Sequence, residues 1–154
     1  MKKIILAAAL ALAVAIPVVA QVNIVSTNLP ISTLTNISAS TTTNAPSTCI
    51  VTANNYDEIG IVARFKIAAT DANTTRGIFT FAREWYGTND FDTFANHQLV
   101  LAITNNGTSY AVGSTNFYMG AFPKLRLVSI QNASTQAMSA VEVRAIYKGR
   151  RNGL

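Results

Sequence analysis

The one histidine of the chain, His97, has an ordinary pKa near neutrality, so it is the first candidate for acid–base catalysis. Its neighbours Asn96 and Gln98 supply no nucleophile, and no serine lies in a G-x-S-x-G motif. A single histidine beside the start of a predicted strand is typical of an ordinary surface or turn residue. We therefore predict no catalytic residue and a protein that is not an enzyme.

The sharpest acidic cluster combines Asn89 with Asp90 and Asp92. Alternating oxygen ligands in a loop can bind calcium, but the EF-hand spacing of Gly and Glu is absent, and the same residue types are common in tight turns. Glu84 and Asp92 form a conceivable glycosidase pair, although any two carboxylates of one loop would do so. One Cys and one His cannot build a His/Cys zinc site. We expect no metal and no cofactor.

The same loop holds the only tryptophan of the chain. Trp85 and Tyr86 follow a predicted strand and precede Gly87, with Asn89 and Asp90 close behind. Exposed aromatic rings beside Asn and Asp can grip a sugar by stacking and directed hydrogen bonds. Alternatively, Trp85 covers the open end of a core. We name Trp85, Tyr86, Asn89 and Asp90 as a candidate ligand-binding loop.

Basic residues gather near the C-terminus, where six of them stand against Glu142 alone. This set can join copies of the chain by meeting an acidic surface on a neighbour, or it can be a solvated basic terminus. Nucleic-acid binding is disfavoured because the cluster is short and lacks interleaved aromatic residues. The candidate assembly contacts are Lys124, Arg126, Arg144, Lys148, Arg150 and Arg151.

The N-terminus has the pattern of a secretory signal. Lys2 and Lys3 precede an apolar run over residues 4–20 that only Pro17 interrupts. The run lies at or below the ~17–25 residues needed to span a bilayer, so a retained apolar arm is the alternative and no membrane contact is expected once the segment is removed. Cleavage after Ala20 would lower the net charge from +5 to +3.

Residues 21–47 are predicted to be an uncharged arm or linker. Residues 26–48 contain 12 Ser or Thr among 23, with two prolines. Such a stretch is either a flexible stalk or an extended arm whose few apolar residues, Leu29, Ile31, Leu34 and Ile37, pack against something else. Just after it lies Cys49, the only cysteine. We expect a buried, inert thiol there, with an intermolecular disulfide as the alternative.

Residues 48–154 are predicted to form one folded domain. The chain has 154 residues, of which 49% are hydrophobic and only 12% charged. Apolar and polar side chains alternate with a period of two, and residues 105–107, Asn-Asn-Gly, form a strong hairpin-turn signal. The pattern predicts an all-β antiparallel sandwich, jelly-roll or immunoglobulin-like. The predicted strands cover residues 59–67, 77–83, 98–104, 109–112, 116–119, 124–130 and 140–148.

Two segments resemble small phage virion structural proteins. They are FAREWYGTNDF over residues 81–91 and FPKLRLVSIQNAS over residues 122–134, the second followed by the final predicted strand to Lys148. The resemblance covers roughly residues 48–154. It implies a β-sandwich that decorates a capsid or builds a tail appendage and has no enzymatic activity.

Two functions therefore remain open at this point. The first is a non-catalytic assembly protein at the surface of a virion, which acts by self-association or by contact with other virion proteins. The second is an exported β-sandwich module, periplasmic or extracellular, that binds a cell-surface glycan through the Trp85 loop.

Overall fold

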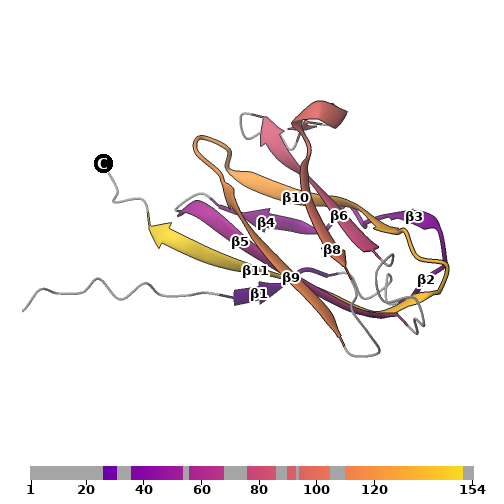
Figure 1. Cartoon of the computed structure of the whole chain (residues 1–154). Helices are drawn as coiled ribbons and strands as arrows, with labels where there is room; N and C mark the ends of the chain where they lie inside the picture. Colours follow the sequence, from indigo (N-terminus) through magenta and orange to yellow (C-terminus); the bar gives the residue numbers. More distant parts are fainter. Residues whose placement is uncertain are drawn as a thin grey trace, which may run out of the picture.

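The computed structural model describes residues 26–30, 36–53, 56–67, 76–85, 90–92, 94–104 and 110–150. Two antiparallel sheets pack face to face (Figure 1). The β5 sheet contains β1 (Ser26–Asn28), β2 (Asn36–Ile37), β5 (Tyr56–Ile67), β9 (Ala111–Tyr118) and β11 (Met138–Arg150). The β6 sheet contains β3 (Thr41–Asn44), β4 (Ile50–Thr52), β6 (Arg76–Trp85), β7 (Asp90–Phe91), β8 (Leu99–Thr104) and β10 (Lys124–Asn132). The predicted all-β sandwich is confirmed.

The order of strands identifies the sandwich as a jelly roll. β1 and β2 both pair with β11, and β3 and β4 both pair with β10, so each couple acts as one interrupted edge strand. The sheets then read β1/β2-β11-β5-β9 and β3/β4-β10-β6-β8. The chain changes sheet at each of its first three connections, from the β1/β2 couple through to β6. An immunoglobulin-like sandwich instead keeps its first two strands together in one sheet.

The described part of the predicted arm belongs to the sandwich. Residues 26–30 and 36–47 contribute β1, β2 and β3, which hydrogen-bond to β11 and β10. Leu29 and Ile37 are buried in the common core, which agrees with the expectation of an extended arm whose apolar residues pack. Ile31 and Leu34 lie outside the described residues. The fold shows no boundary at residue 48.

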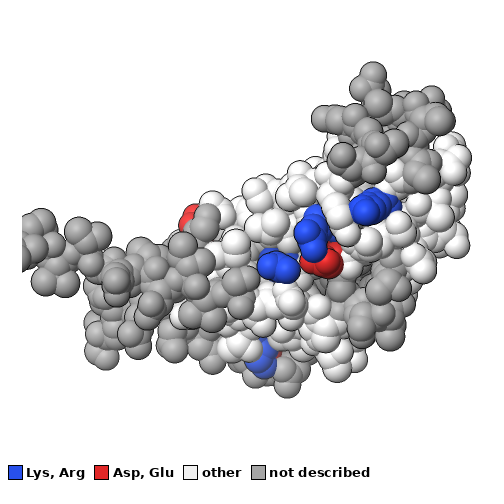
Figure 2. Space-filling view, turned by 90° about the horizontal axis from the view of Figure 1, so that it is seen from below, with Lys and Arg blue, Asp and Glu red and all other residues white. Residues whose placement is uncertain are grey.

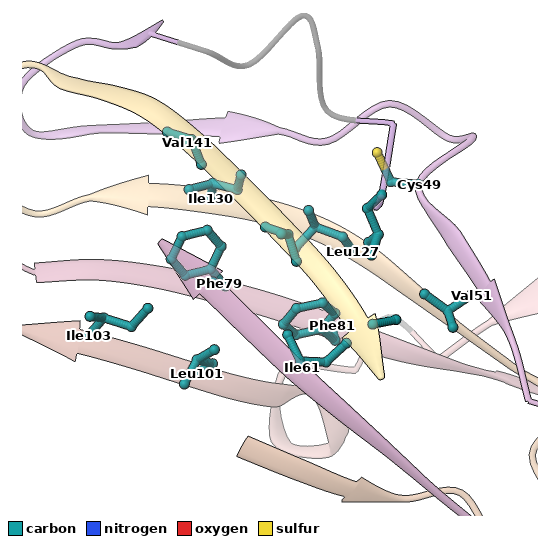
Figure 3. Close-up of a cluster of buried hydrophobic side chains, with 14 of the residues drawn as sticks. Cys49, Val51, Ile61, Phe79, Phe81, Leu101, Ile103, Leu127, Ile130 and Val141 are labelled. Carbon is teal, nitrogen blue, oxygen red and sulfur yellow. The ribbon is translucent and has the colours of Figure 1, made fainter. Parts of the chain in front are cut away.

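The core lies between the two sheets (Figure 3). β5 turns Ile59, Ile61, Phe65 and Ile67 inward, because successive side chains of a strand point to opposite faces of the sheet. The facing layer comes from β6, β8 and β10 and includes Phe79, Phe81, Leu101, Ile103, Leu125, Leu127 and Ile130. At one point the sheets approach so closely that a Cβ on Gly77 would lie 2.5 Å from Cε1 of Phe65. That contact explains why the position carries glycine.

The expected hairpin after residue 104 is corrected by the structure. β8 pairs with β6, and β9 pairs with β5, so the two strands flanking residues 105–109 lie in different sheets. The predicted strands at 109–112 and 116–119 are one strand, β9, which runs through Gly113 because its missing side chain makes room for Ile103 across the core. The short 3-10 helix η2 (Ala95–His97) lies between β7 and β8.

Candidate functional site

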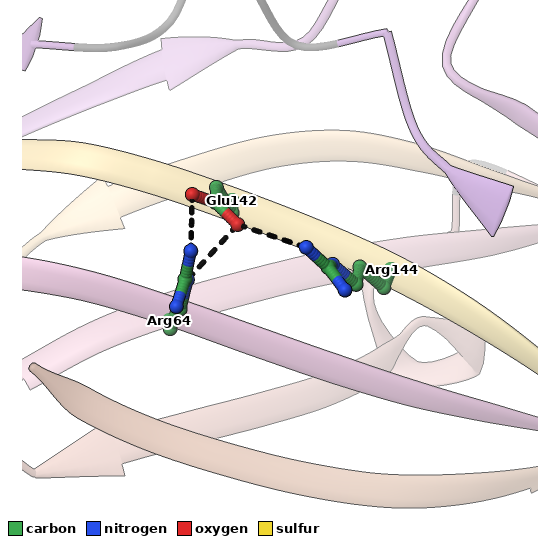
Figure 4. A network of polar contacts seen from close by, with 3 residues as sticks. All are labelled: Arg64, Glu142 and Arg144. Atoms are coloured by element: carbon green, nitrogen blue, oxygen red, sulfur yellow. Dashed lines mark hydrogen bonds and ion pairs between the residues drawn. The ribbon is translucent and has the colours of Figure 1, made fainter. Parts of the chain in front are cut away.

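A network of three charged side chains lies on the outer face of the β5 sheet (Figure 4). Arg64 of β5 stands directly opposite Glu142 of β11 and holds it with two hydrogen bonds, Nε to Oε2 at 2.9 Å and Nη2 to Oε1 at 2.6 Å. Nη2 of Arg144 is 3.6 Å from Oε2 of the same carboxylate. Figure 2, which views this face from below, shows basic side chains beside an acidic one on a largely uncharged surface.

The geometry of the network shifts the pKa of both main partners. The hydrogen bonds from Arg64 lower the pKa of Glu142, and the same bonds raise the pKa of Arg64. The ring of Tyr110, just before β9, makes cation–π contacts with Arg64 and Lys66. The guanidinium carbon of Arg64 is 4.7 Å from the ring centroid, and Nζ of Lys66 is 4.5 Å from it. Arg64 is thereby held in place, whereas Arg144 keeps most of its donors for other contacts.

A shallow hollow of about 270 Å³ opens between these side chains. Val62 and Val112 give it apolar walls, and Arg64, Glu142 and Arg144 surround them. Such a surface can bind a partner by apolar contact and by hydrogen bonds from guanidinium groups.

The six basic residues expected to form one surface are divided between the two faces of the sandwich. Lys124 and Arg126 point away from the core on β10, in the β6 sheet, while Arg144 points outward on β11, in the β5 sheet. The single basic surface is therefore wrong for the described residues, because β10 and β11, although consecutive in the chain, belong to opposite sheets. The side chains of Lys148 and Arg150, and the whole of Arg151, lie outside the described residues.

Two of these cations have local partners. Nζ of Lys124 is 3.1 Å from Oε1 of Glu84, whose side chain is fully buried. The guanidinium of Arg126 lies 4.5 Å from the ring centroid of Phe91, which the short strand β7 places on the outer face of the β6 sheet. Both residues thus stabilise the segment that covers this end of the sheet.

The proposed ligand loop is described only at its two ends. β6 and β7 pair so that Trp85 stands opposite Asp90, while Tyr86 and Asn89 lie outside the described residues. Trp85 is half-buried, and its ring meets that of Phe122 edge-on at 6.2 Å. Phe122 packs against the core. The indole therefore covers one end of the sandwich core, which was the alternative to a ligand-binding role. Asp90 is exposed.

His97 lies at the end of η2 and is exposed. Its Nδ1 is 2.8 Å from Oδ2 of Asp92, and Oδ1 of the same carboxylate accepts a hydrogen bond from the backbone N–H of Phe94. Asp92 thus closes a turn, as expected for this residue type. Among the described residues, no group of three His, Cys, Asp or Glu side chains is arranged to hold a metal ion.

Sequence reasoning missed the exposed apolar side chains that lie on or beside β8 and β9. The large apolar residues that the described chain leaves exposed all fall between residues 94 and 118: Phe94, Val100, Tyr110, Val112 and Tyr118. The alternation of apolar residues marked which side chains point inward. It carried no signal for the outward ones, because their exposure depends on which strands end up at the edge of a sheet.

Comparison with known proteins does not place the chain in a family. No family model matches it, and no curated protein matches it significantly. The strand order defines a jelly-roll sandwich, and the large apolar side chains that its described residues leave exposed lie on or beside β8 and β9. Within the described residues, no helix is long and apolar enough to cross a membrane.

Proposed function

We propose that this chain is a non-catalytic structural protein that acts through repeated subunit contacts as a surface component of a virion, a capsid decoration or an appendage. One observation carries the proposal: the large apolar side chains that the described residues leave exposed lie on or beside β8 and β9, the edge strands of the two sheets on one side of the sandwich. Val100 points outward on the β6 sheet, and Val112 and Tyr118 point outward on the β5 sheet, so a protein that packs along this side would cover apolar surface of both sheets.

The fold and the charge distribution support the same function. Jelly-roll domains build viral capsids, although they also occur in lectins and enzymes, so the fold alone does not decide the function. The Arg64–Glu142–Arg144 network places donors beside apolar walls on a broad sheet face, which suits contact with another protein. The expected partners are further copies of the chain or other proteins of the particle.

The decisive experiment asks whether the protein is part of a particle. Particles from a culture that expresses the chain are banded in a density gradient and probed with an antibody against the folded sandwich. We expect the protein to sediment with intact particles and to bind antibody without their disruption. Recovery of all the protein outside the particle band would contradict the proposal. An N-terminus at Gln21 on protein recovered outside the cell would favour export instead.

An exported carbohydrate-binding module is the second candidate. Pairing of β6 with β7 sets a half-buried indole, Trp85, opposite an exposed carboxylate, Asp90, an arrangement that can support one sugar ring. Under this function, Trp85→Ala abolishes retention on immobilised cell-wall polysaccharide, while Phe94→Ala, which removes another exposed aromatic ring, leaves it unchanged. Equal retention of the wild type and both variants would exclude a carbohydrate-binding function for this loop.

A further inference from the structure

The hollow on the outer face of the β5 sheet exists because a short side chain lies among long ones. Val62 of the central strand β5 lines it, and the two ladders of β5 set Arg144 on one side of Val62 and Ser114 on the other. Gly60, the preceding outward position of β5, adds no side chain. The guanidinium groups of Arg64 and Arg144 therefore border a depression instead of a filled surface.

The two guanidinium groups at the hollow differ in how they are held. Arg64 donates two hydrogen bonds to Glu142 and packs on the ring of Tyr110, so its position is fixed. Arg144 has a side chain that is 50% exposed, and its one contact with the described residues is the approach of Nη2 to Oε2 of Glu142 at 3.6 Å (Figure 4). That distance is longer than a hydrogen bond. Arg144 therefore presents its donors beside the hollow.

The charge at the hollow favours an anion. Two guanidinium groups line it against the single carboxylate of Glu142, and both oxygens of that carboxylate already face cations of this chain. Farther along β5, Lys66 and Glu58 lie four residues to either side of Val62, about 14 Å away, and offset each other. A cation bound here would meet net repulsion, whereas an anion would accept hydrogen bonds from Arg144.

The size and the walls of the hollow indicate what carries the anion. Its volume of about 270 Å³ is below the roughly 300–1,000 Å³ of sites that enclose small molecules, and it is shallow. Val62 and Val112 offer aliphatic surface directly beside the donors of Arg144. A carboxylate side chain with an aliphatic neighbour suits this combination, because arginine pairs with carboxylates through a planar fork and valine packs on aliphatic groups.

We propose that this hollow binds an acidic segment of a partner protein. One Asp or Glu side chain of the segment accepts hydrogen bonds from Arg144, and a neighbouring aliphatic side chain packs on Val62 and Val112. Because Glu142 attracts the guanidinium of Arg144 without forming a hydrogen bond to it, the group stays beside the hollow and keeps its donors for the carboxylate of the partner. The inference rests on the proposed function, since it states the chemistry of one of the protein partners.

The test is a titration of the isotopically labelled full chain, followed by NMR of its backbone amides. The probe is the capped peptide acetyl-Val-Glu-Val-amide, and acetyl-Val-Gln-Val-amide is its uncharged control. We expect the glutamate peptide to shift the amide signals of Val62, Val112 and Arg144, with a dissociation constant on the order of 1 mM. The glutamine peptide should bind at least about fivefold more weakly, because it offers no charge to the guanidinium.

Matched substitutions locate the site. Arg144→Gln should weaken binding of the glutamate peptide at least about fivefold, while Arg126→Gln, which removes the same charge from the other sheet, should leave it unchanged. Arg144→Lys keeps the charge but loses the planar fork, so it should retain only part of the affinity. All three variants should keep the circular dichroism spectrum of the wild type, because neither arginine is buried.

Three outcomes would overturn the inference. These are equal binding of the glutamate and glutamine peptides, equal weakening by Arg144→Gln and Arg126→Gln, and unchanged signals around the hollow at roughly 10 mM glutamate peptide. Methyl glucuronoside tests an acidic sugar in the same assay, and binding as tight as that of the glutamate peptide would replace the protein partner by a glycan.

Failure of this inference and failure of the proposed function are distinguishable. None of the peptide results bears on whether the protein sediments with particles. A chain that binds the glutamate peptide through Arg144 but is absent from particles would refute the proposed function and leave the acidic-segment site intact.

Discussion

The ammonium of Lys124 lies 3.1 Å from the carboxylate of Glu84, directly across the β10–β6 ladder, and the Glu84 side chain has no exposed surface. Removing a cation from a buried carboxylate is costly, because the remaining charge stays desolvated. Lys124→Met should therefore lower the free energy of unfolding by about 3 kcal/mol. Arg126→Met, which loses only a ring contact with Phe91, should cost about 1 kcal/mol. Urea denaturation measures both; equal losses would contradict this ranking.

Asn132 should be the most sensitive polar residue of the β10–β11 connection. Its side chain is buried, its Nδ2 lies within 3.1 Å of the carbonyls of Ile37, Ser38 and Gln136, and its Oδ1 accepts the N–H of Ser134. Asn132→Ala leaves these backbone groups without a partner and should cost about 2–3 kcal/mol of unfolding free energy. Gln131→Ala, on an exposed neighbour, should change it by less than about 0.5 kcal/mol. A chemical denaturation series would show the difference, and a tolerated Asn132→Ala would refute it.

The ion pair between Arg64 and Glu142 should appear in the acid titration of the protein. Because the pKa of Glu142 is lower in the folded than in the unfolded chain, the pair stabilises the fold above the ordinary pKa of Glu142. That contribution disappears as the pH falls through the lowered value. Arg64→Met should raise the pH at the midpoint of the Glu142 titration, which carbon NMR of its carboxyl group would follow. Arg144→Met should move it less, since Arg144 is farther from the carboxylate. The reverse order would be inconsistent with the structure.

The thiol of Cys49 should be unreactive in the folded protein. Cys49 has no exposed surface, its Sγ donates to the carbonyl of Pro30 at 3.3 Å, and burial raises the pKa of the thiol. We expect no reaction with a thiol reagent at neutral pH until denaturant is added, and then one thiol per chain. Rapid labelling of the folded protein, or a wild-type disulfide dimer on a non-reducing gel, would show that the thiol is accessible.

The sequence alone determined the long strands and the class of fold. In β5, β6, β10 and β11, alternating apolar residues mark one buried face, and this pattern depends only on the pleat of a strand. It could not reveal β1 to β3, because strands of two to four residues rich in Ser, Thr and Asn have the composition of a loop. Their pairing depends on β10 and β11, which lie about a hundred residues away.

Tertiary structure alone decided which surfaces exist. Arg144 could be named from its place in a basic C-terminal segment, but Arg64 could not, since its partner Glu142 lies 78 residues away on a neighbouring strand. For the same reason Lys124 and Arg144, close in sequence, face opposite sides of the sandwich. The place of β9 at the end of its sheet is likewise a property of strand order. A side chain's inward or outward direction follows from its neighbours in the chain, whereas its contacts follow from which strands pair across long loops.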